Sequence, residues 1–254
     1  MKRWRGIVVP AALLALAELA FCARSGPSDS LASPSHAITT LWTALTDASL
    51  LVGTAQTLAA LLAGLALGGF AGLAAGIALG SSDLLRRLTF LTIEMLRPIP
   101  SVALLPLSLL IFGFGYRMEI AVIAFATFWP SLILTQSAVT QIEPRLIEVA
   151  SILRLSRLQT VSKIILPAAA PRLMTALRLA AGLALVVAVT AEIVSNPQGL
   201  GHDLMIAQET LRPERMFAVL FWVGLIGWGK NAALLRLERW LFAHRGEVDT
   251  SVAT

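Results

Sequence analysis

The chain has 254 residues, of which 57% are hydrophobic and only 14% charged, and its mean hydropathy is +0.78. Soluble domains carry about 25% charged residues, so the composition excludes an ordinary soluble domain and indicates a membrane protein with several spans. The formal net charge of +5 does not indicate binding to nucleic acid, because no basic stripe is interleaved with aromatic residues.

The first apolar segment covers residues 6–23 and is long enough for a membrane-crossing helix, which needs about 20 residues. A signal peptide is the alternative interpretation, because three basic residues precede the segment. Bulky Phe21 beside Cys22 makes a poor cleavage site, so a retained span is the favoured prediction. An external Ser- and Pro-rich linker, 24–35, follows, and residues 37–49 are expected to form an amphipathic helix approaching the membrane.

The second predicted span, 50–80, contains a glycine at every fourth position of its second half. This spacing lays a ridge without side chains along one face of a helix. Lipid tails give helices no hydrophobic reason to associate, so such a ridge serves to let another backbone approach closely. Packing within the chain is the simpler interpretation, and a subunit contact or a moving seam is the alternative. The ridge consists of Gly64, Gly68, Gly72, Gly76 and Gly80.

The third predicted span, 96–112, carries three prolines, Pro98, Pro100 and Pro106. Each proline removes an amide donor and clashes with a preceding carbonyl, so the helix must bend or break. At membrane depth a break is tolerated only where it packs in protein or faces a water-filled cavity. Glu94 and Arg97, three residues apart, are placed to pair on one helix face.

Three more spans are predicted at 119–139, 174–194 and 216–235, which gives six in all. Of the 20 Lys and Arg residues, two, Arg97 and Arg178, lie near the cytoplasmic ends of spans. Of the other 18, 14 fall on one side of the predicted topology and four fall on the other. By the positive-inside rule, both termini are therefore expected in the cytoplasm. The four external residues are Arg24, Arg117, Arg212 and Arg215.

A basic insert, 143–171, separates the fourth and fifth spans. Pro144 suits the first turn of a helix, and Ser156 with Gln159 forms a capping box that starts a second helix, which Pro167 is expected to end. The prediction is a cytoplasmic helix-turn-helix, basic on one side and apolar on the other. It could lie on anionic lipid headgroups or dock into a groove on a soluble partner, and composition does not decide between them.

The insert resembles the cytoplasmic EAA loop of binding-protein-dependent ABC transporter permeases. That loop reads Glu-Ala-Ala, three residues, Gly, nine residues, Ile, one residue, Leu-Pro. Five of the seven marked positions match here, and Val149 and Arg154 depart from the pattern. The stretch 96–115, Ala191-Glu192 and Gly199-Leu200-Gly201 are similar to permeases of the nitrate, aliphatic sulfonate and taurine uptake group. The matching loop residues are Glu148, Ala150, Ile164, Leu166 and Pro167.

The resemblance implies that the insert is the coupling element, which fits a groove on a cytoplasmic ABC ATPase subunit. It also implies a permease homodimer and a solute-binding protein on the outer side, meeting the short segments 113–118 and 196–215. If the family glycine adopts a left-handed turn, Arg154 is strained by about 1–2 kcal/mol there. The residues assigned to ATPase coupling are Glu148, Ala150, Arg154, Ser156, Arg157, Leu166 and Pro167.

Polar residues inside the spans are candidates for the solute pathway or a gate, because ionisable and polar groups at membrane depth are costly. For Glu192, just before Asn196-Pro197, capping or pairing around that turn is the alternative. The candidates are Gln56, Ser131, Gln136, Thr190 and Glu192.

The chain carries no recognisable catalytic set, metal-ligand spacing or cofactor loop, and its one cysteine excludes an internal disulfide. We therefore expect a transport subunit rather than an enzyme: an all-α, six-span permease in the bacterial inner membrane, importing a small anion such as nitrate, sulfonate or taurine. A self-contained secondary transporter or facilitator is the alternative. The expected organisation is a first span with its linker (1–36), a permease core (37–245) and a short cytoplasmic tail (246–254).

Overall fold

The computed structural model describes residues 32–243 and the isolated positions 12, 15, 16, 18, 19 and 21. The predicted first span, its linker and the cytoplasmic tail therefore lie almost entirely outside the described residues. Within the described part the chain is helical and contains no strand, as predicted. The α-helices are α2 (Pro34–Thr46), α3 (Ser49–Gly80), α4 (Asp83–Leu96), α5 (Leu105–Phe112), α6 (Tyr116–Thr140), α7 (Pro144–Ile152), α8 (Arg157–Thr160), α9 (Leu166–Val194), α10 (Leu200–Glu209) and α11 (Pro213–Phe242).

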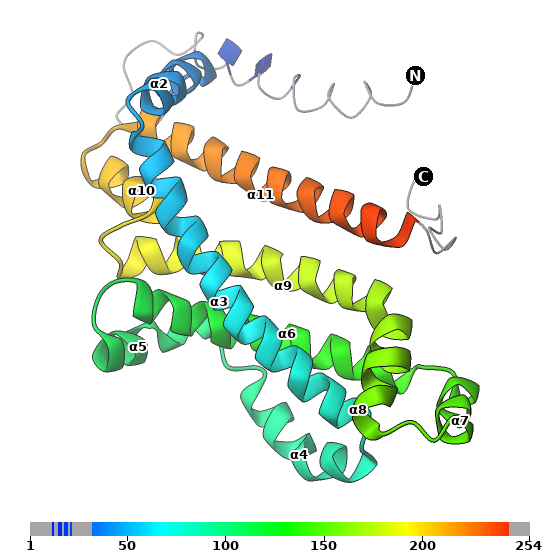
Figure 1. Ribbon diagram of the computed structural model, residues 1–254. Helices are drawn as coiled ribbons and strands as arrows, with labels where there is room; N and C mark the ends of the chain where they lie inside the picture. The colour runs from blue at the N-terminus through cyan, green and yellow to red at the C-terminus, as the bar shows by residue number, and fades with distance from the viewer. Residues whose placement is uncertain (1–11, 13–14, 17, 20, 22–31, 244–254) are drawn as a thin grey trace.

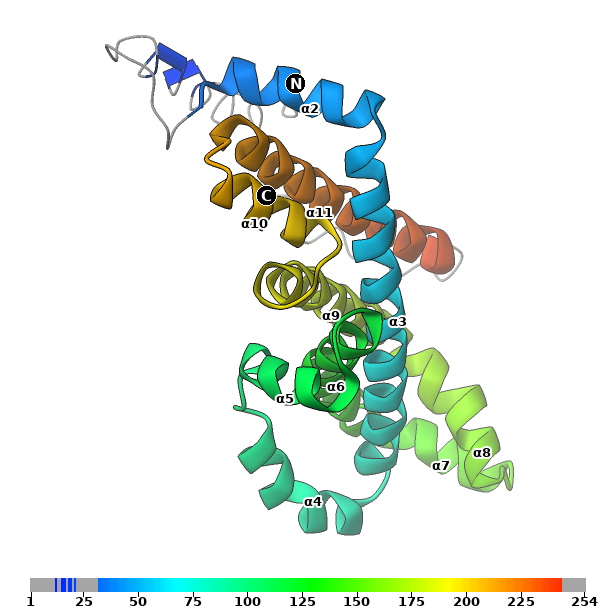
Figure 2. The ribbon, with the colours of Figure 1, turned by 90° about the vertical axis from the view of Figure 1, so that its left-hand side faces the viewer.

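The long helices run between two ends of the molecule (Figure 1). One end carries α2, α5 and α10, and the other carries α7 and α8. Figure 2 views α6 and α9 nearly end-on and shows them in a row with α11, while α3 runs past all three. The main core lies among α3, α5, α6 and α9, and a smaller core joins α2, α3, α10 and α11. The bundle thus holds the α7–α8 segment at one end and α10 at the other.

Four described helices are long and apolar enough to cross a membrane, and they include the second, fourth, fifth and sixth predicted spans. The second ends at Gly80, where the sequence places its end. The sixth is longer than predicted at both ends. Pro130 stands inside α6 without interrupting it. Lys230 of α11 donates to the carbonyl of Ala181 in α9, and Arg178 of α9 pairs with Glu238 of α11. These contacts hold α11 beside α9.

The third predicted span differs from its prediction. Residues 96–112 do not form one helix: α4 ends at Leu96, a short 3₁₀ turn follows at Ser101–Leu104, and α5 contributes eight residues. The two halves are bent by 80°. Pro98 and Pro100 fall in the break, so the missing amide donors explain the interruption that the sequence predicts. Counted as one broken span, this pair raises the number of spans in the described part to five.

The glycine ridge of α3 packs on α6 along its whole length. A Cβ built on any of the five glycines would come within 3.0 Å of α6 atoms. At Gly64 it would lie 2.6 Å from Cβ of Ile123, and at Gly76 2.6 Å from the carbonyl oxygen of Leu132. The backbones of α3 and α6 are therefore in close contact, and the glycine ridge packs within the chain.

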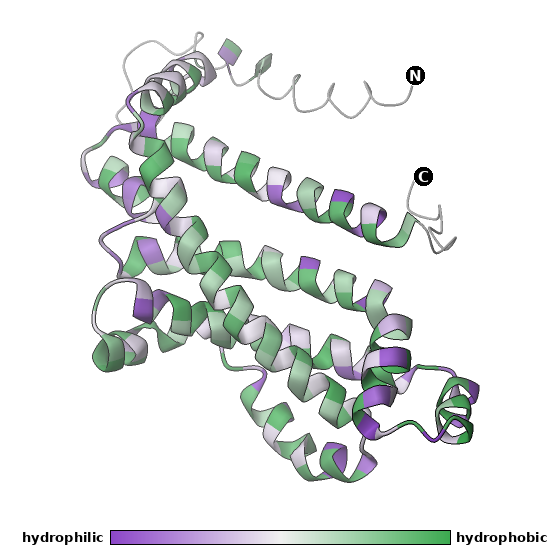
Figure 3. Cartoon of the chain, viewed as in Figure 1, coloured by the Kyte–Doolittle hydropathy of each residue, from purple (hydrophilic) through white to green (hydrophobic). Residues whose placement is uncertain are grey.

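Large apolar side chains cover the outside of the bundle. Leu62, Leu67 and Phe70 of α3 are 61%, 61% and 71% exposed. A soluble monomer rarely shows apolar surface on this scale, whereas hydrocarbon is a suitable solvent for it. Figure 3 shows hydrophobic residues along most of α3, α6 and α9, with hydrophilic residues gathered in the turns and around α7 and α8.

We expect Gly72→Ala to lower the melting temperature of the purified protein in detergent. Its added methyl group would meet the carbonyl oxygen of Phe128 and, at 2.8 Å, Cβ of Ser131. Overpacking of this kind costs about 1–3 kcal/mol. The matched control is Gly69→Ala in the same helix, where the nearest atom lies 3.8 Å away. An equal loss of stability in both variants would contradict close packing as the role of the ridge.

Candidate functional site

The coupling element predicted from sequence forms a protruding pair of short helices, α7 and α8 (Figure 1). Pro144 occupies the first turn of α7, where its missing amide has no helical partner to lose. The capping box of α8 is complete: Ser156 N–H donates to Oε1 of Gln159 at 2.9 Å, and Gln159 N–H donates to Oγ of Ser156 at 3.3 Å. The local sequence therefore specifies both helix starts.

Arg154 lies in the left-handed region, with φ of 50°. The N–H of Leu155 donates to the carbonyl of Ala150, and the N–H of Arg154 donates to that of Ser151, each at 3.0 Å. These two bonds are the Schellman pattern that glycine normally closes. Arginine thus adopts the glycine conformation at a cost of about 1–2 kcal/mol. Its side chain is exposed and joins no ion pair in the described part of the chain.

The second helix of the element does not end at Pro167, contrary to prediction. After α8 the chain makes a π-helical turn at Val161–Ile165 and continues directly into α9. Residues 157–194 therefore form one 38-residue helical rod. Leu166 and Pro167 lie in the first turn of α9. The preceding π turn has already changed the hydrogen-bond pattern there, so a proline, which has no N–H to donate, does not end the helix. The predicted terminator is instead the joint between the element and a membrane span.

Several apolar side chains of the element point away from the bundle. Ile152, Leu153 and Leu158 are 77%, 63% and 80% exposed, whereas Ala150 is buried. Glu148, Arg154 and the other predicted coupling residues on α7 and α8 share this protruding segment. An exposed apolar surface flanked by basic residues is suited to a groove on another protein.

At the opposite end of the rod, Glu192 holds the start of α10. Its Oε2 accepts from the N–H of Gly201 at 2.8 Å, and it is fully buried. Gly199, with φ of 94°, packs against the same carboxyl group, and Gly201 packs against the α9 backbone, so closely that neither position has room for a Cβ. We call Glu192, Gly199, Leu200 and Gly201 the α10 clamp.

Two further contacts tie the α10 clamp to α3. The N–H of Gly199 donates to Oε1 of Gln56 at 2.9 Å, and that of Leu200 donates to Oγ1 of Thr57 at 3.0 Å. Sequence reasoning offers Gln56 and Glu192 as pathway or gate candidates. In the structure both side chains accept hydrogen bonds from backbone N–H groups at the start of α10.

Glu119 of α6 lies beside the clamp. Its Oε2 accepts from Nδ2 of Asn196 at 2.7 Å, and its carboxyl group interacts with that of Glu192. The turn before α6 also belongs to this region, since a Cβ on Gly115 would lie 3.6 Å from Nε2 of Gln198. Oε1 of both glutamates and Oδ1 of Asn196 are buried without a hydrogen-bond partner in the described part. The start of α6, the end of α9 and the turn before α10 therefore meet at one buried polar cluster.

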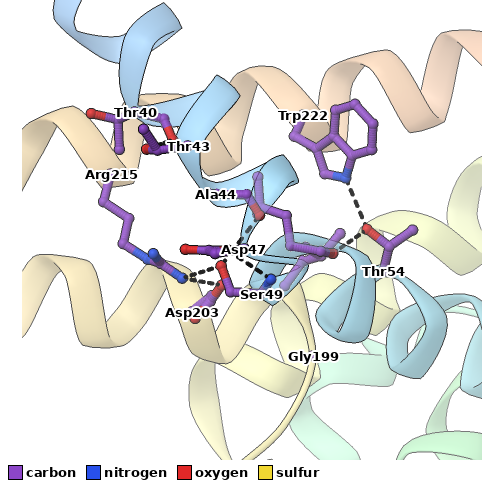
Figure 4. Close-up of polar contacts among 12 residues, drawn as sticks. Thr40, Thr43, Ala44, Asp47, Ser49, Thr54, Gly199, Asp203, Arg215 and Trp222 are labelled. Carbon is purple, nitrogen blue, oxygen red and sulfur yellow. Dashed lines mark hydrogen bonds and ion pairs between the residues drawn. The ribbon is translucent and has the colours of Figure 1, made fainter.

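A polar network secures the other side of α10 (Figure 4). Arg215 of α11 pairs with Asp203 of α10 at 3.0 Å and donates to Oγ of Ser49 at 3.4 Å. The N–H of Ser49 donates to Asp47, and this bond lowers the pKa of the Asp47 carboxyl below its usual value. Trp222 donates from Nε1 to Oγ1 of Thr54 at 2.8 Å. α10 is therefore held by α3, α9 and α11 together.

Two of the cavities along the described part of the bundle distinguish the remaining candidates. Ser131 lines a cavity of about 550 Å³ with mostly apolar walls from α3, α9 and α11. Gln136 and Thr190 line neither cavity, and the hydroxyl of Thr190 donates to the carbonyl of Val186 in its own helix. The larger cavity, of about 880 Å³, lies between the break after α4 and the middle of α6 and α9.

Sequence reasoning missed the charged residues of the larger cavity, Arg97 and Arg178. It treats Arg97 as a partner of Glu94, but neither joins an ion pair in the described part of the chain. It only places Arg178 near the cytoplasmic end of a span, and the structure pairs this residue with Glu238. The signal that could have found this cavity is the proline-broken span itself. Among the described residues no group of three His, Cys, Asp or Glu side chains could hold a metal ion.

Comparison with known proteins places residues 64–243 in the family model described as "Binding-protein-dependent transport system inner membrane component". The putative aliphatic sulfonates transport permease protein SsuC of Bacillus subtilis is 32% identical over 73% of this chain and 67% of its own length. The taurine transport system permease protein TauC of Escherichia coli is 33% identical over 70% of this chain and 64% of its own. The nitrate import permease protein NrtB of Leptolyngbya laminosa is 33% identical over 74% and 67%. The match thus spans about two thirds of the length of these relatives.

The fold is similar to that of a solved transporter. One chain of the inward-facing MetNI methionine ABC transporter matches 75% of this chain and 94% of its own length with a TM-score of 0.66. Its sequence identity is 22%, so this likeness concerns the fold alone.

We expect Gly201→Ala to release α10 from α9. The added methyl group would lie 2.7 Å from Cβ of Glu192 and closer still to the carbonyl oxygen of Val189. Hydrogen exchange followed by mass spectrometry should show faster exchange in α10, with α3 and α6 unchanged. Gly224→Ala is the control, since nothing lies within 4 Å of a Cβ there. Unchanged α10 protection in Gly201→Ala would show that the clamp does not hold this helix.

Proposed function

Because the chain belongs to the family of binding-protein-dependent transport system inner membrane components, we propose that it couples a separate ABC ATPase to the passage of a small anion. The family makes it a multi-pass permease subunit of an ABC transporter in the inner membrane. The remaining points, which are the solute, the ATPase contact, the orientation and the assembly, are proposals.

The protruding element is the observation that carries the ATPase contact. Its apolar side chains are exposed at the end of the bundle, and its second helix runs without interruption into α9. If α7 and α8 sit in a groove on the ATPase, a movement of that groove would therefore move a membrane span directly. We assign this end, with both chain termini, to the cytoplasm, in keeping with its basic residues.

The opposite end then faces the solute-binding protein. The segments 113–118 and 196–215 lie close together there, as the neighbouring Gly115 and Gln198 show. Because the α10 clamp fastens α10 to the end of α9, a binding protein seated on α10 would act on the same rod as the ATPase. Two copies of the chain would enclose the pathway.

The proposed solute is a small anion. The relatives are named as permeases for aliphatic sulfonates, taurine and nitrate, and a bicarbonate transport permease, CmpB of Synechococcus elongatus, is 30% identical over 77% of this chain. Each of these solutes carries a negatively charged oxygen-bearing group.

Reconstitution tests the function. Proteoliposomes that contain the permease with its ATPase subunit, and a binding protein loaded with taurine, a sulfonate, nitrate or bicarbonate, should take up the solute only when ATP is present. Omitting the binding protein is expected to lower uptake to background. Uptake by the permease alone, driven by an ion gradient, would instead establish the secondary-transporter alternative.

Arg154→Gly tests the ATPase contact. A strained residue persists where a contact offsets its cost, so we expect the glycine variant to be more stable thermally and yet to bind the ATPase about two- to fivefold more weakly, the size of an exposed ion pair. Affinity is measured by biolayer interferometry on nanodiscs. Arg154→Asn, which tolerates the same backbone without the charge, is the matched control and should bind as weakly. Unchanged affinity in both variants would show that Arg154 makes no contact with the ATPase that contributes to binding.

A further inference from the structure

The larger cavity lies beside the middle of α6 and of α9. Trp129 stands near the centre of α6, and Thr175 lies near the centre of the rod formed by residues 157–194. The third wall is the break after α4, where Arg97 is the last residue before the proline-containing turn. Irregular backbone between membrane-spanning helices requires protein or water around it.

The charges of this cavity are one-sided. Its lining includes two arginines and no Asp or Glu. Arg178 is neutralised by Glu238, but Arg97 is exposed and joins no ion pair in the part of the chain described by the structure. The nearest acid in sequence, Glu94, is also exposed and joins no ion pair with any other described residue. An uncompensated arginine on the wall of a transmembrane bundle is costly against hydrocarbon, so the guanidinium group of Arg97 is expected to meet water or a ligand.

Two hydroxyl-bearing residues share the cavity wall with this charge. Ser101 follows Arg97 on the same wall. Thr175 lines the cavity from α9, where its hydroxyl donates to the carbonyl of Pro171. The rest of the wall is mostly apolar, so Arg97 supplies its uncompensated charge.

We propose that this cavity is an anion-binding station on the solute pathway, in which the guanidinium group of Arg97 binds a small oxyanion. A group with two or three oxygens that share one negative charge accepts the paired donors of a guanidinium in bidentate geometry. Ser101 lines the same space and adds a hydroxyl group. This inference rests on the proposed function and deepens it, because it names where inside the membrane the anion is held.

Charge-selective labelling tests the site without any partner protein. The chain has a single cysteine, Cys22, so Cys22→Ser gives a background free of thiols. Thr175→Cys then places one thiol in the cavity, and purified protein in nanodiscs is labelled with an anionic, sulfonate-bearing or a cationic, ammonium-bearing methanethiosulfonate. The measured quantity is the ratio of the two labelling rates.

Arg97→Gln in this background should lower the ratio of anionic to cationic labelling by about fourfold or more, the effect of removing one unit charge about 10 Å away in watery surroundings. Arg97→Lys should retain most of the ratio. Arg87→Gln is the matched control, because Arg87 lies on α4 near its start and lines neither cavity. Nitrate added at constant ionic strength against gluconate should slow labelling only when Arg97 is present.

Three results would overturn the proposal: an unchanged ratio in Arg97→Gln, equal slowing by nitrate with and without Arg97, or a thiol that reacts with neither reagent until the protein is denatured. Because the assay uses neither ATPase nor binding protein, its failure is separate from a failure of ATP-driven uptake. A loss of folding in Arg97→Gln would appear as aggregation on gel filtration, and Arg97→Lys then carries the test through its nitrate protection.

Discussion

The close contact between α3 and α6 is the constraint on which the other parts of the structure depend. In a bilayer, helices gain nothing from burying apolar surface against one another, because lipid tails are equally apolar. Attraction must come from close packing, and the glycine ridge allows α6 to approach within the space that side chains would occupy. α6 then provides the surface on which the middle of α9 packs. Without this contact, neither the rod nor the cavity would have a fixed wall.

The rod formed by residues 157–194 joins the two ends of the molecule mechanically. At 1.5 Å per residue it measures about 57 Å, and its ends are fixed by local chemistry: the capping box of Ser156 and Gln159 at one end and the α10 clamp at the other. The π turn at Val161–Ile165 is the departure from regular helix along it. A displacement of α7 and α8 must therefore tilt the whole rod or be absorbed at this turn.

Sequence reasoning succeeded where local chemistry decides the structure. The ridge, the helix starts at Pro144 and Ser156 and the break around Pro98 and Pro100 all follow from residues close together in the chain. It failed where the outcome depends on distant partners. Pro167 ends a helix by its own preference, but the preceding π turn lets the chain continue. Glu119 and Asn196 are 77 residues apart, so no local pattern announces their contact.

The three regions of functional interest share one helix. The rod of residues 157–194 begins in the proposed coupling element, carries Thr175 and Arg178 in the wall of the larger cavity near its middle, and carries Glu192 near its end. Arg97, in contrast, belongs to the break after α4, which is a separate wall. A tilt of the rod would therefore change the distance between Arg97 and α9, and with it the space available to an anion. A mechanical signal from either end of the molecule would thus reach the cavity through the same helix.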